Sequence, residues 1–138
     1  MNLSKRVLLD TDILSAVIRR RPPIVERARF YLVEHQRFSF SAITQYEVLR
    51  GVLAKGATGQ HRAFERFCGS SEVLAITPPI IDRAAEIYAD LYRRGLLIGD
   101  ADILIAATAL SHGYVLATNN GFHFGRITEL QIDNWLEG

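Results

Sequence analysis

Apolar and polar positions along the chain fall into short hydrophobic runs separated by longer segments with helical spacing. The runs are rich in β-prone residues and predict strands at residues 6–9, 38–41, 73–76 and 114–118, with an edge strand around Leu130 and Ile132. Helical spacing of apolar residues predicts helices at residues 12–19, 42–55, 60–68 and 101–112, and after Pro22–Pro23 and Pro78–Pro79. Because strands that alternate with helices are typical of parallel sheets, we expect an α/β fold. Its predicted architecture is a three-layer α/β/α sandwich around a mostly parallel sheet of four to five strands.

Two of the predicted helices differ in how much of their surface is apolar. The helix that begins at Pro78 and stops at Gly95 is amphipathic, with a face made of Ile80, Ile81, Ala84, Ile87, Tyr88, Leu91 and Tyr92. Residues 101–112 are apolar around most of the helix. We therefore expect this second helix to be buried at the centre of the fold.

Length and composition indicate one domain that spans residues 1–138. With 138 residues and 49% hydrophobic side chains, the chain can bury a substantial core. No apolar run approaches the ~18 residues that cross a bilayer, and the N-terminus lacks a signal-peptide layout, so we expect a cytoplasmic protein with no membrane partner. The single cysteine, Cys68, excludes an internal disulfide, and the net charge of +1 gives no global argument for nucleic-acid binding.

Acidic or amide side chains follow several of the apolar runs. In chain order they are Asp10, Asp12, Glu47, Asp100, Asp102, Asn119 and Asn120. Ligands of open α/β sheets bind beyond the carboxyl ends of the strands, where these side chains are expected. Carboxylates gathered there repel one another unless a cation joins them. The pattern therefore predicts a hard divalent metal and metal-assisted chemistry on phosphate.

Each acid also has an ordinary structural interpretation. Asp10 can cap the helix that starts near Asp12, and its spacing favours neither capping nor metal binding. Asp12 is interpreted as a charge that suits the positive end of the helix dipole. Glu47 can form an exposed ion pair with Arg50 at i+3, although its helix begins at a strand end and so lies near the same edge as Asp10.

The later acids and amides leave similar alternatives open. Asp100 is a natural N-cap preceded by Gly99, which permits a tight turn. Asp102 lies in the first turn of a helix that should be buried, so it either accepts backbone donors or faces a cation. Asparagine offers a carbonyl ligand or tolerates a turn, and we interpret Asn119 as a turn residue.

Four blocks of the sequence together resemble PIN-domain nucleases, and specifically the VapC-type toxins of toxin–antitoxin operons. The blocks are LLDTDILS at 8–15, SAITQYEVLRG at 41–51, IGDADILIAATALSHGYVLATNN at 98–120 and FGRITELQIDNW at 124–135. The third block is the most specific, because an acid precedes its Ile-Ala-Ala run at a fixed offset. The resemblance covers essentially the whole chain and implies an α/β/α sandwich around a parallel sheet.

The resemblance also implies site residues and a cofactor. Asp10, Glu47 and Asp102 match the three acids of the family, and with Asn120 they form the expected catalytic set. Asn120 falls where many members have a fourth acid, which puts a second metal ion in doubt. The expected ligands of Mg²⁺ or Mn²⁺ are Asp10, Glu47 and Asp102, with Asp100 at a position that is only sometimes acidic. Thr118 matches a hydroxyl position that orients a ligand or water, and so belongs to the expected substrate-binding residues.

The implied activity is divalent-metal-dependent endoribonuclease cleavage of RNA. By resemblance we expect a homodimer, inhibition by a cognate antitoxin protein, and contact with operator DNA only through that antitoxin. Arg19 and Arg20, at the end of the first helix, are the expected substrate-binding cations, although cations there also complement the helix dipole. No histidine is required, and we interpret the four histidines as structural or surface residues: His35, His61, His112 and His123.

Two other functions fit parts of the pattern. In a haloacid-dehalogenase-like phosphatase, Asp10 would be the nucleophile and Asp12 the acid, but the chain is short and lacks the expected lysine, since Lys55 lies too early. The second alternative is a non-catalytic PIN-like partner that binds an antitoxin and, with it, DNA. Asn120 in place of an acid is the feature that permits this second alternative.

Overall fold

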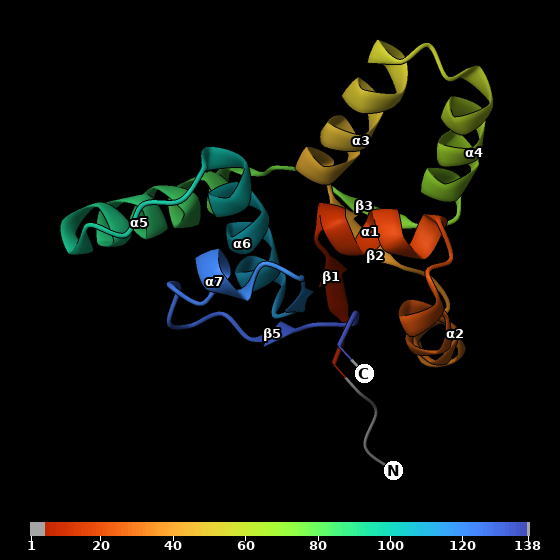
Figure 1. Ribbon diagram of the computed structural model, residues 1–138. Coiled ribbons are helices and arrows are strands. Elements are labelled where there is room, and N and C mark those ends of the chain that lie inside the picture. The colour runs from red at the N-terminus through yellow and green to blue at the C-terminus, as the bar shows by residue number, and fades with distance from the viewer. Residues whose placement is uncertain (1–4, 138) are drawn as a thin grey trace.

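A parallel five-stranded sheet forms the centre of the computed structural model, which describes residues 5–137 (Figure 1). The strand order is β3-β2-β1-β4-β5, and every neighbouring pair is parallel. The strands are β1 (Val7–Leu9), β2 (Ser39–Ser41), β3 (Glu72–Leu74), β4 (Val115–Ala117) and β5 (Ile132–Asp133). The predicted α/β class, the parallel sheet and the edge strand near Ile132 are therefore confirmed.

Helices cover both faces of the sheet and complete the three layers. They are α1 (Thr11–Ile18), α2 (Pro22–His35), α3 (Ala42–Ala54), α4 (Thr58–Gly69), α5 (Pro78–Arg94), α6 (Asp100–His112) and α7 (Gly121–Phe124). Figure 1 shows α5 and α6 on one side of β1, with α1, α2 and α4 on the other. Between residues 5 and 137, no helix is long and apolar enough to span a membrane.

The alternation of side chains along β1 divides the core into two parts. Leu8 packs with residues of α5 and α6, whereas Val7 and Leu9 point to the opposite face and pack with residues of α1 and α2. All three side chains are buried. This strand therefore lies at the centre of the molecule, and the residue that follows it is positioned from both sides.

Strand register brings the carboxyl ends of β1 and β4 together. Leu9 pairs with Ala117, and the Asp10 amide donates to the Ala117 carbonyl at 2.9 Å. On the other side of β1, strand β2 ends at Ser41, and α3 follows without a loop. The first residues after three adjacent strands therefore lie at one edge of the sheet, as the sequence predicts.

The burial predicted for α6 is confirmed, whereas that predicted for α5 is confirmed only in part. Helix α6 is central as predicted, with Ile103, Ile105, Ala106, Ala107 and Ala109 buried. The apolar face of α5 is narrower than predicted: Ile80, Ala84, Ile87 and Leu91 are buried, but Ile81, Tyr88 and Tyr92 are 49%, 44% and 64% exposed. The buried residues form one i, i+4, i+7 row, and the exposed ones lie about 100° further around the helix.

Candidate active site

Asp10 connects the end of β1 to the ends of β4 and α1. Its Oδ1 accepts the amide of Thr11 at 2.8 Å, and it is the N-cap residue of α1. Its Oδ2 accepts the hydroxyl of Thr118 at 2.7 Å. Since the side chain is only 6% exposed, both oxygens are held by protein donors rather than by bulk water. The capping alternative is thus correct, and it places the carboxylate at the expected edge of the sheet.

The environment of Asp10 strongly disfavours its charged form. Burial is the main cause, followed by the nearby negative charge of Asp12, and together they raise the pKa of Asp10 from 3.8 to about 7. The hydrogen bonds from Thr118 and Thr11 oppose this change but do not cancel it. A buried acid whose pKa lies near neutrality is a common property of functional sites.

Asp12 belongs to the same group of acids, although the sequence interpretation assigned it only as a charge at the start of the helix. Its Oδ2 accepts the amide of Asn119 at 3.0 Å, so the start of α1 is tied to the chain just after β4. Its Oδ1 is buried and has no hydrogen-bond partner among residues 5–137. Burial raises the pKa of Asp12 as well. The signal in the sequence was the Asp-Thr-Asp spacing, which puts two carboxylates on the first turn of one helix.

Glu47 on α3 is linked to the start of α1. The Thr11 hydroxyl donates to Glu47 Oε1 at 2.6 Å and lies 3.2 Å from the hydroxyl of the buried Thr44. The expected ion pair with Arg50 also forms, but it is long, with 3.9 Å between Arg50 Nη2 and Glu47 Oε2. The stronger contact of Glu47 is therefore the short one with Thr11. It holds Glu47 toward Asp10 and Asp12, and these three acids together with Asp102 are called the acid cluster below.

Asp102 faces the other acids from α6. Its pKa is raised by burial and by the charges of Glu47 and Asp12, while His123 acts in the opposite direction. Asp100 differs, because it is exposed and is the first residue of α6. The residue at the N-cap position is Gly99, so the expectation that Asp100 caps the helix is wrong. Asp100 is two residues before Asp102 on the same helix and remains a predicted ligand.

The polar residues after β4 form a connected group. The backbone N–H of Asn120 donates to Thr118 Oγ1 at 2.9 Å. The side-chain oxygen of Asn120 accepts the backbone N–H of His123 at 3.4 Å and so caps α7. Asn120 Nδ2 also lies 3.0 Å from His123 Nδ1. Asn120 is thus engaged with His123, which lies close enough to Asp102 to lower the pKa of that acid. His123 is therefore close to the acids, which the sequence did not indicate because the four-residue helix α7 was not predicted.

The two arginines expected to bind substrate lie elsewhere. Arg19 and Arg20 are exposed and follow the last residue of α1, whereas Asp10 and Asp12 are at its beginning. Eight helical residues separate these ends by about 12 Å. Arg20 has φ +53, a left-handed conformation in the turn that leads to α2. The structure does not bring these two side chains into the acid cluster.

The donor set suits a hard divalent cation, although it is not closed around one. Among residues 5–137, no three His, Cys, Asp or Glu side chains are already gathered as metal ligands. The acids nevertheless share one edge. Burial raises the pKa values of Asp10, Asp12 and Asp102, and neighbouring acids add to this for Asp10 and Asp102. Within the described part of the chain, Asp12 Oδ1 is buried without a hydrogen-bond partner. A cation would relieve both the repulsion and the unpaired oxygen. Carboxylate oxygens are the ligands that Mg²⁺ and Mn²⁺ prefer.

Comparison with known proteins agrees with this arrangement. The chain is 33% identical over 132 residues to the ribonuclease VapC2 of Haemophilus influenzae, covering 95% of this chain and 98% of the relative. It is 33% identical over 131 residues to the tRNA(fMet)-specific endonuclease VapC of Salmonella typhimurium, covering 94% and 98%. A crystal structure of DNA-bound VapBC from Salmonella typhimurium superposes with a TM-score of 0.83 at 30% identity, covering 96% and 99%.

The family itself is given by the match of the PIN domain to residues 7–130, which contain every acid of the cluster. The phosphatase alternative is therefore set aside. The resemblance seen in the four sequence blocks is confirmed over nearly the whole chain. This chain belongs to the PIN-domain family and is similar throughout its length to the VapC ribonucleases.

Proposed function

We propose that this protein is a divalent-metal-dependent endoribonuclease and the toxin of a toxin–antitoxin pair. The proposal is carried by the buried Asp10, whose pKa is raised to about 7, at the edge of a parallel sheet. Beside it lies Asp12 Oδ1, which is buried and has no hydrogen-bond partner among residues 5–137. Relatives that align over almost all of the chain are ribonucleases by name, which supports RNA as the substrate class.

The proposed ligands of Mg²⁺ or Mn²⁺ are Asp10, Glu47 and Asp102, with Asp100 as a further candidate. When bound, such an ion supplies an activated water and charge neutralisation at the scissile phosphate. The protein supplies orientation: Thr118 fixes one oxygen of Asp10, and Thr11 fixes one oxygen of Glu47. Ligands held by a second layer of hydrogen bonds keep the geometry that phosphodiester hydrolysis requires.

Asn120 and the arginines complete the proposed catalytic and substrate-binding set. The Asn120 side chain adds no charge. The backbone N–H of Asn120 donates to Thr118 Oγ1, so the proposed role of this residue is to hold the hydroxyl that orients Asp10. Arg19 and Arg20 are exposed cations that are free to meet RNA phosphates beyond the scissile bond. Their distance from the acids argues for a role in affinity rather than in cleavage.

The proposed partners are a cognate antitoxin, a second copy of this chain, and operator DNA reached through the antitoxin. Support comes from the related VapBC of Salmonella typhimurium, which was crystallised bound to DNA. An antitoxin segment with a basic side chain near Asp10 and Asp12 would neutralise the acids as a cation does. The net charge of +1 gives the chain itself no general attraction to DNA.

The test is cleavage of a mixed RNA pool by purified, antitoxin-free protein in Mg²⁺, in Mn²⁺ and in EDTA. Asp10→Asn and Asp102→Asn are compared with Asp82→Asn, an exposed acid on α5. We expect cleavage with either metal, no cleavage in EDTA, and a loss of at least about 100-fold only in the first two variants. RNA that stays intact while metal binds would favour the non-catalytic binding alternative and overturn the proposal.

A further inference from the structure

Two exposed aromatic rings of this protein each carry an arginine guanidinium over one face. The Arg50 guanidinium carbon lies 5.3 Å from the centre of the Tyr46 ring, and that of Arg126 lies 4.9 Å from the centre of the Phe122 ring. Tyr46 is 58% exposed and Phe122 is 78% exposed. Exposure of this kind leaves most of each ring in contact with water, so neither pair contributes to the hydrophobic core.

Both aromatic–arginine pairs lie next to the acids, on opposite sides of β1. Tyr46 precedes Glu47 on α3, which follows β2, and Arg50 forms the long ion pair with Glu47. Phe122 is on α7, which follows β4, and its ring centre is 5.6 Å from that of His123. Since β1 lies between β2 and β4 in the sheet, the two pairs flank the end of the strand that presents Asp10.

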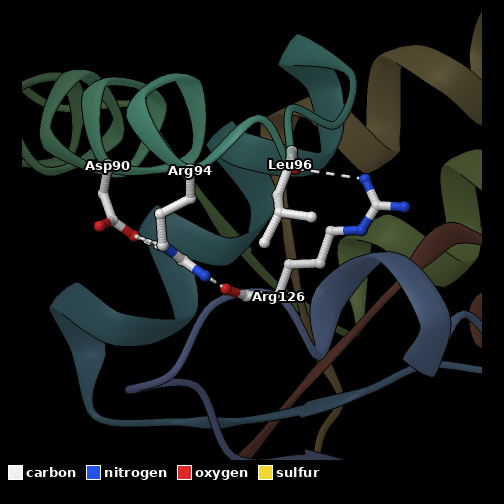
Figure 2. A network of polar contacts seen from close by, with 4 residues as sticks. All are labelled: Asp90, Arg94, Leu96 and Arg126. Carbon is white, nitrogen blue, oxygen red and sulfur yellow. Dashed lines mark hydrogen bonds and ion pairs between the residues drawn. The ribbon is translucent and has the colours of Figure 1, made fainter.

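The pair of Phe122, on α7, with Arg126, just after α7, is held by contacts with the segment between α5 and α6. Arg126 Nη1 donates to the carbonyls of Leu96 at 3.2 Å and Leu97 at 3.1 Å. Arg94 donates to the Arg126 carbonyl at 2.7 Å and is held in turn by Asp90 at 2.5 Å, as Figure 2 shows. The Leu96 and Leu97 carbonyls hold the Arg126 guanidinium, and Arg94 holds the Arg126 backbone, before any ligand arrives. This order lowers the entropy cost of binding.

We propose that Tyr46 with Arg50, and Phe122 with Arg126, are stacking platforms for unpaired RNA bases on the two sides of the scissile phosphate. This inference rests on the proposed function, because it takes the acid cluster as the point of cleavage. Every nucleobase has a π-face that stacks on an aromatic ring, and arginine adds cation–π and phosphate contacts. Bases are available for stacking only where they are unpaired, so the preferred substrate is single-stranded or looped RNA.

The position of the pairs favours RNA over a protein partner as the occupant. Each of these pairs combines one ring with one cation beside acids, and this combination suits a nucleobase together with a phosphate. The two arginines also offset electrostatic repulsion, since RNA must approach carboxylates that repel its phosphates. Arg50 and Arg126 place positive charge on both flanks of that cluster.

The experiment measures the affinity of a short, labelled, mixed-sequence RNA, both single-stranded and annealed into a duplex, in EDTA so that it is not cleaved. Tyr46→Ala and Phe122→Ala are compared with Tyr92→Ala on α5 and Phe30→Ala on α2, which are 64% and 71% exposed in the wild type. We expect about 5- to 100-fold weaker binding of single strands for each of the first two variants, and no change for the controls. Phe122→Trp should retain wild-type affinity, because it keeps a ring.

Equal affinities for all four alanine variants would overturn the stacking platforms, even if the wild type cleaves RNA. An unchanged RNA affinity together with altered self-association in sedimentation would also overturn them and assign the rings to a protein interface. If instead the platform variants lose RNA binding but the metal-loaded wild type cleaves no RNA, the platforms stand and the proposed nuclease function fails. In metal, the same variants should raise KM more than they lower kcat, because they act on binding.

Discussion

The Thr118 hydroxyl donates to Asp10 Oδ2 at 2.7 Å, although the two residues are 108 positions apart in the chain. The bond exists because β1 and β4 pair in parallel and end together, with Leu9 opposite Ala117. The hydrogen bond lowers the pKa of Asp10, whereas burial raises it. This contact therefore connects the register of the sheet to the charge state of the acid on which the proposed activity depends.

Thr118→Val removes this donor with little change in volume. The pKa of Asp10 should then rise further above about 7, because a hydrogen bond that favours the carboxylate is lost. The acidic limb of the pH profile for metal-dependent RNA cleavage should move to higher pH, whereas Thr118→Ser should keep the wild-type profile. An acidic limb at the same pH in Thr118→Val and the wild type would show that the bond does not tune Asp10.

The stability of the metal-free protein should depend on the ionisation of Asp10. Its folded pKa of about 7 is raised above the ordinary 3.8, so its contribution to stability is complete below about pH 4 and is lost as the pH rises through 7. Asp10→Asn has no such titrating group, so its stability should not fall in this way. At pH 8 it should be more stable than the wild type, by at most about 4 kcal/mol. Urea denaturation of both proteins at pH 5 and pH 8 measures this difference, which should grow with pH and vanish if the pKa is not raised.

Asp12→Asn should stabilise the metal-free protein and weaken its response to metal. The amide keeps an acceptor for the Asn119 N–H but removes the charge that repels Asp10. We expect a gain of about 1 kcal/mol without metal, or about 4 °C in Tm, and a smaller rise in Tm on addition of Mg²⁺. Asp82→Asn should leave both values unchanged. A metal-free Asp12→Asn protein that is less stable than the wild type would contradict the proposed repulsion.

Arg19→Ala combined with Arg20→Gly tests the predicted phosphate contacts without disturbing the turn. Glycine suits the φ of +53 at position 20, where alanine would be strained. We expect weaker RNA binding and a salt dependence of log K that is flatter by about 0.7 per lost phosphate contact on single strands. Fluorescence anisotropy at several salt concentrations measures this slope. If the slope is unchanged, these arginines do not contact RNA.

The fold and the principal acids could be predicted because they depend on local patterns. Short apolar runs followed by Asp10, and an apolar helix that starts at Asp102, are visible in the sequence and fix the order of strands and helices. The parallel register then places residues after β1, β2 and β4 at one edge without further information. Only this general rule was needed to bring Asp10 and Glu47 to the same region.

The remaining parts of the site depend on contacts between residues that are distant in the sequence. Asp12 was interpreted as a helix-start charge, because nothing local indicates that Asn119 would bind one oxygen and leave the other buried. His123 was interpreted as structural, because α7 is too short to give a periodic pattern. The exposed rings of Tyr46 and Phe122 were not singled out in the sequence, because nothing in their local pattern shows that each lies against an arginine.

Calorimetric titration of Mn²⁺ into metal-free protein near pH 7 tests most directly whether the buried acids form a cation site. Repeating the titration in buffers with different ionisation enthalpies counts the protons released. We predict saturable binding by the wild type with release of a fraction of one proton, since the pKa of Asp10 is about 7. Asp10→Asn should lose this binding, and Asp82→Asn should retain it. Equal Mn²⁺ binding by the wild type and Asp10→Asn, or no binding by either folded protein, would contradict the account.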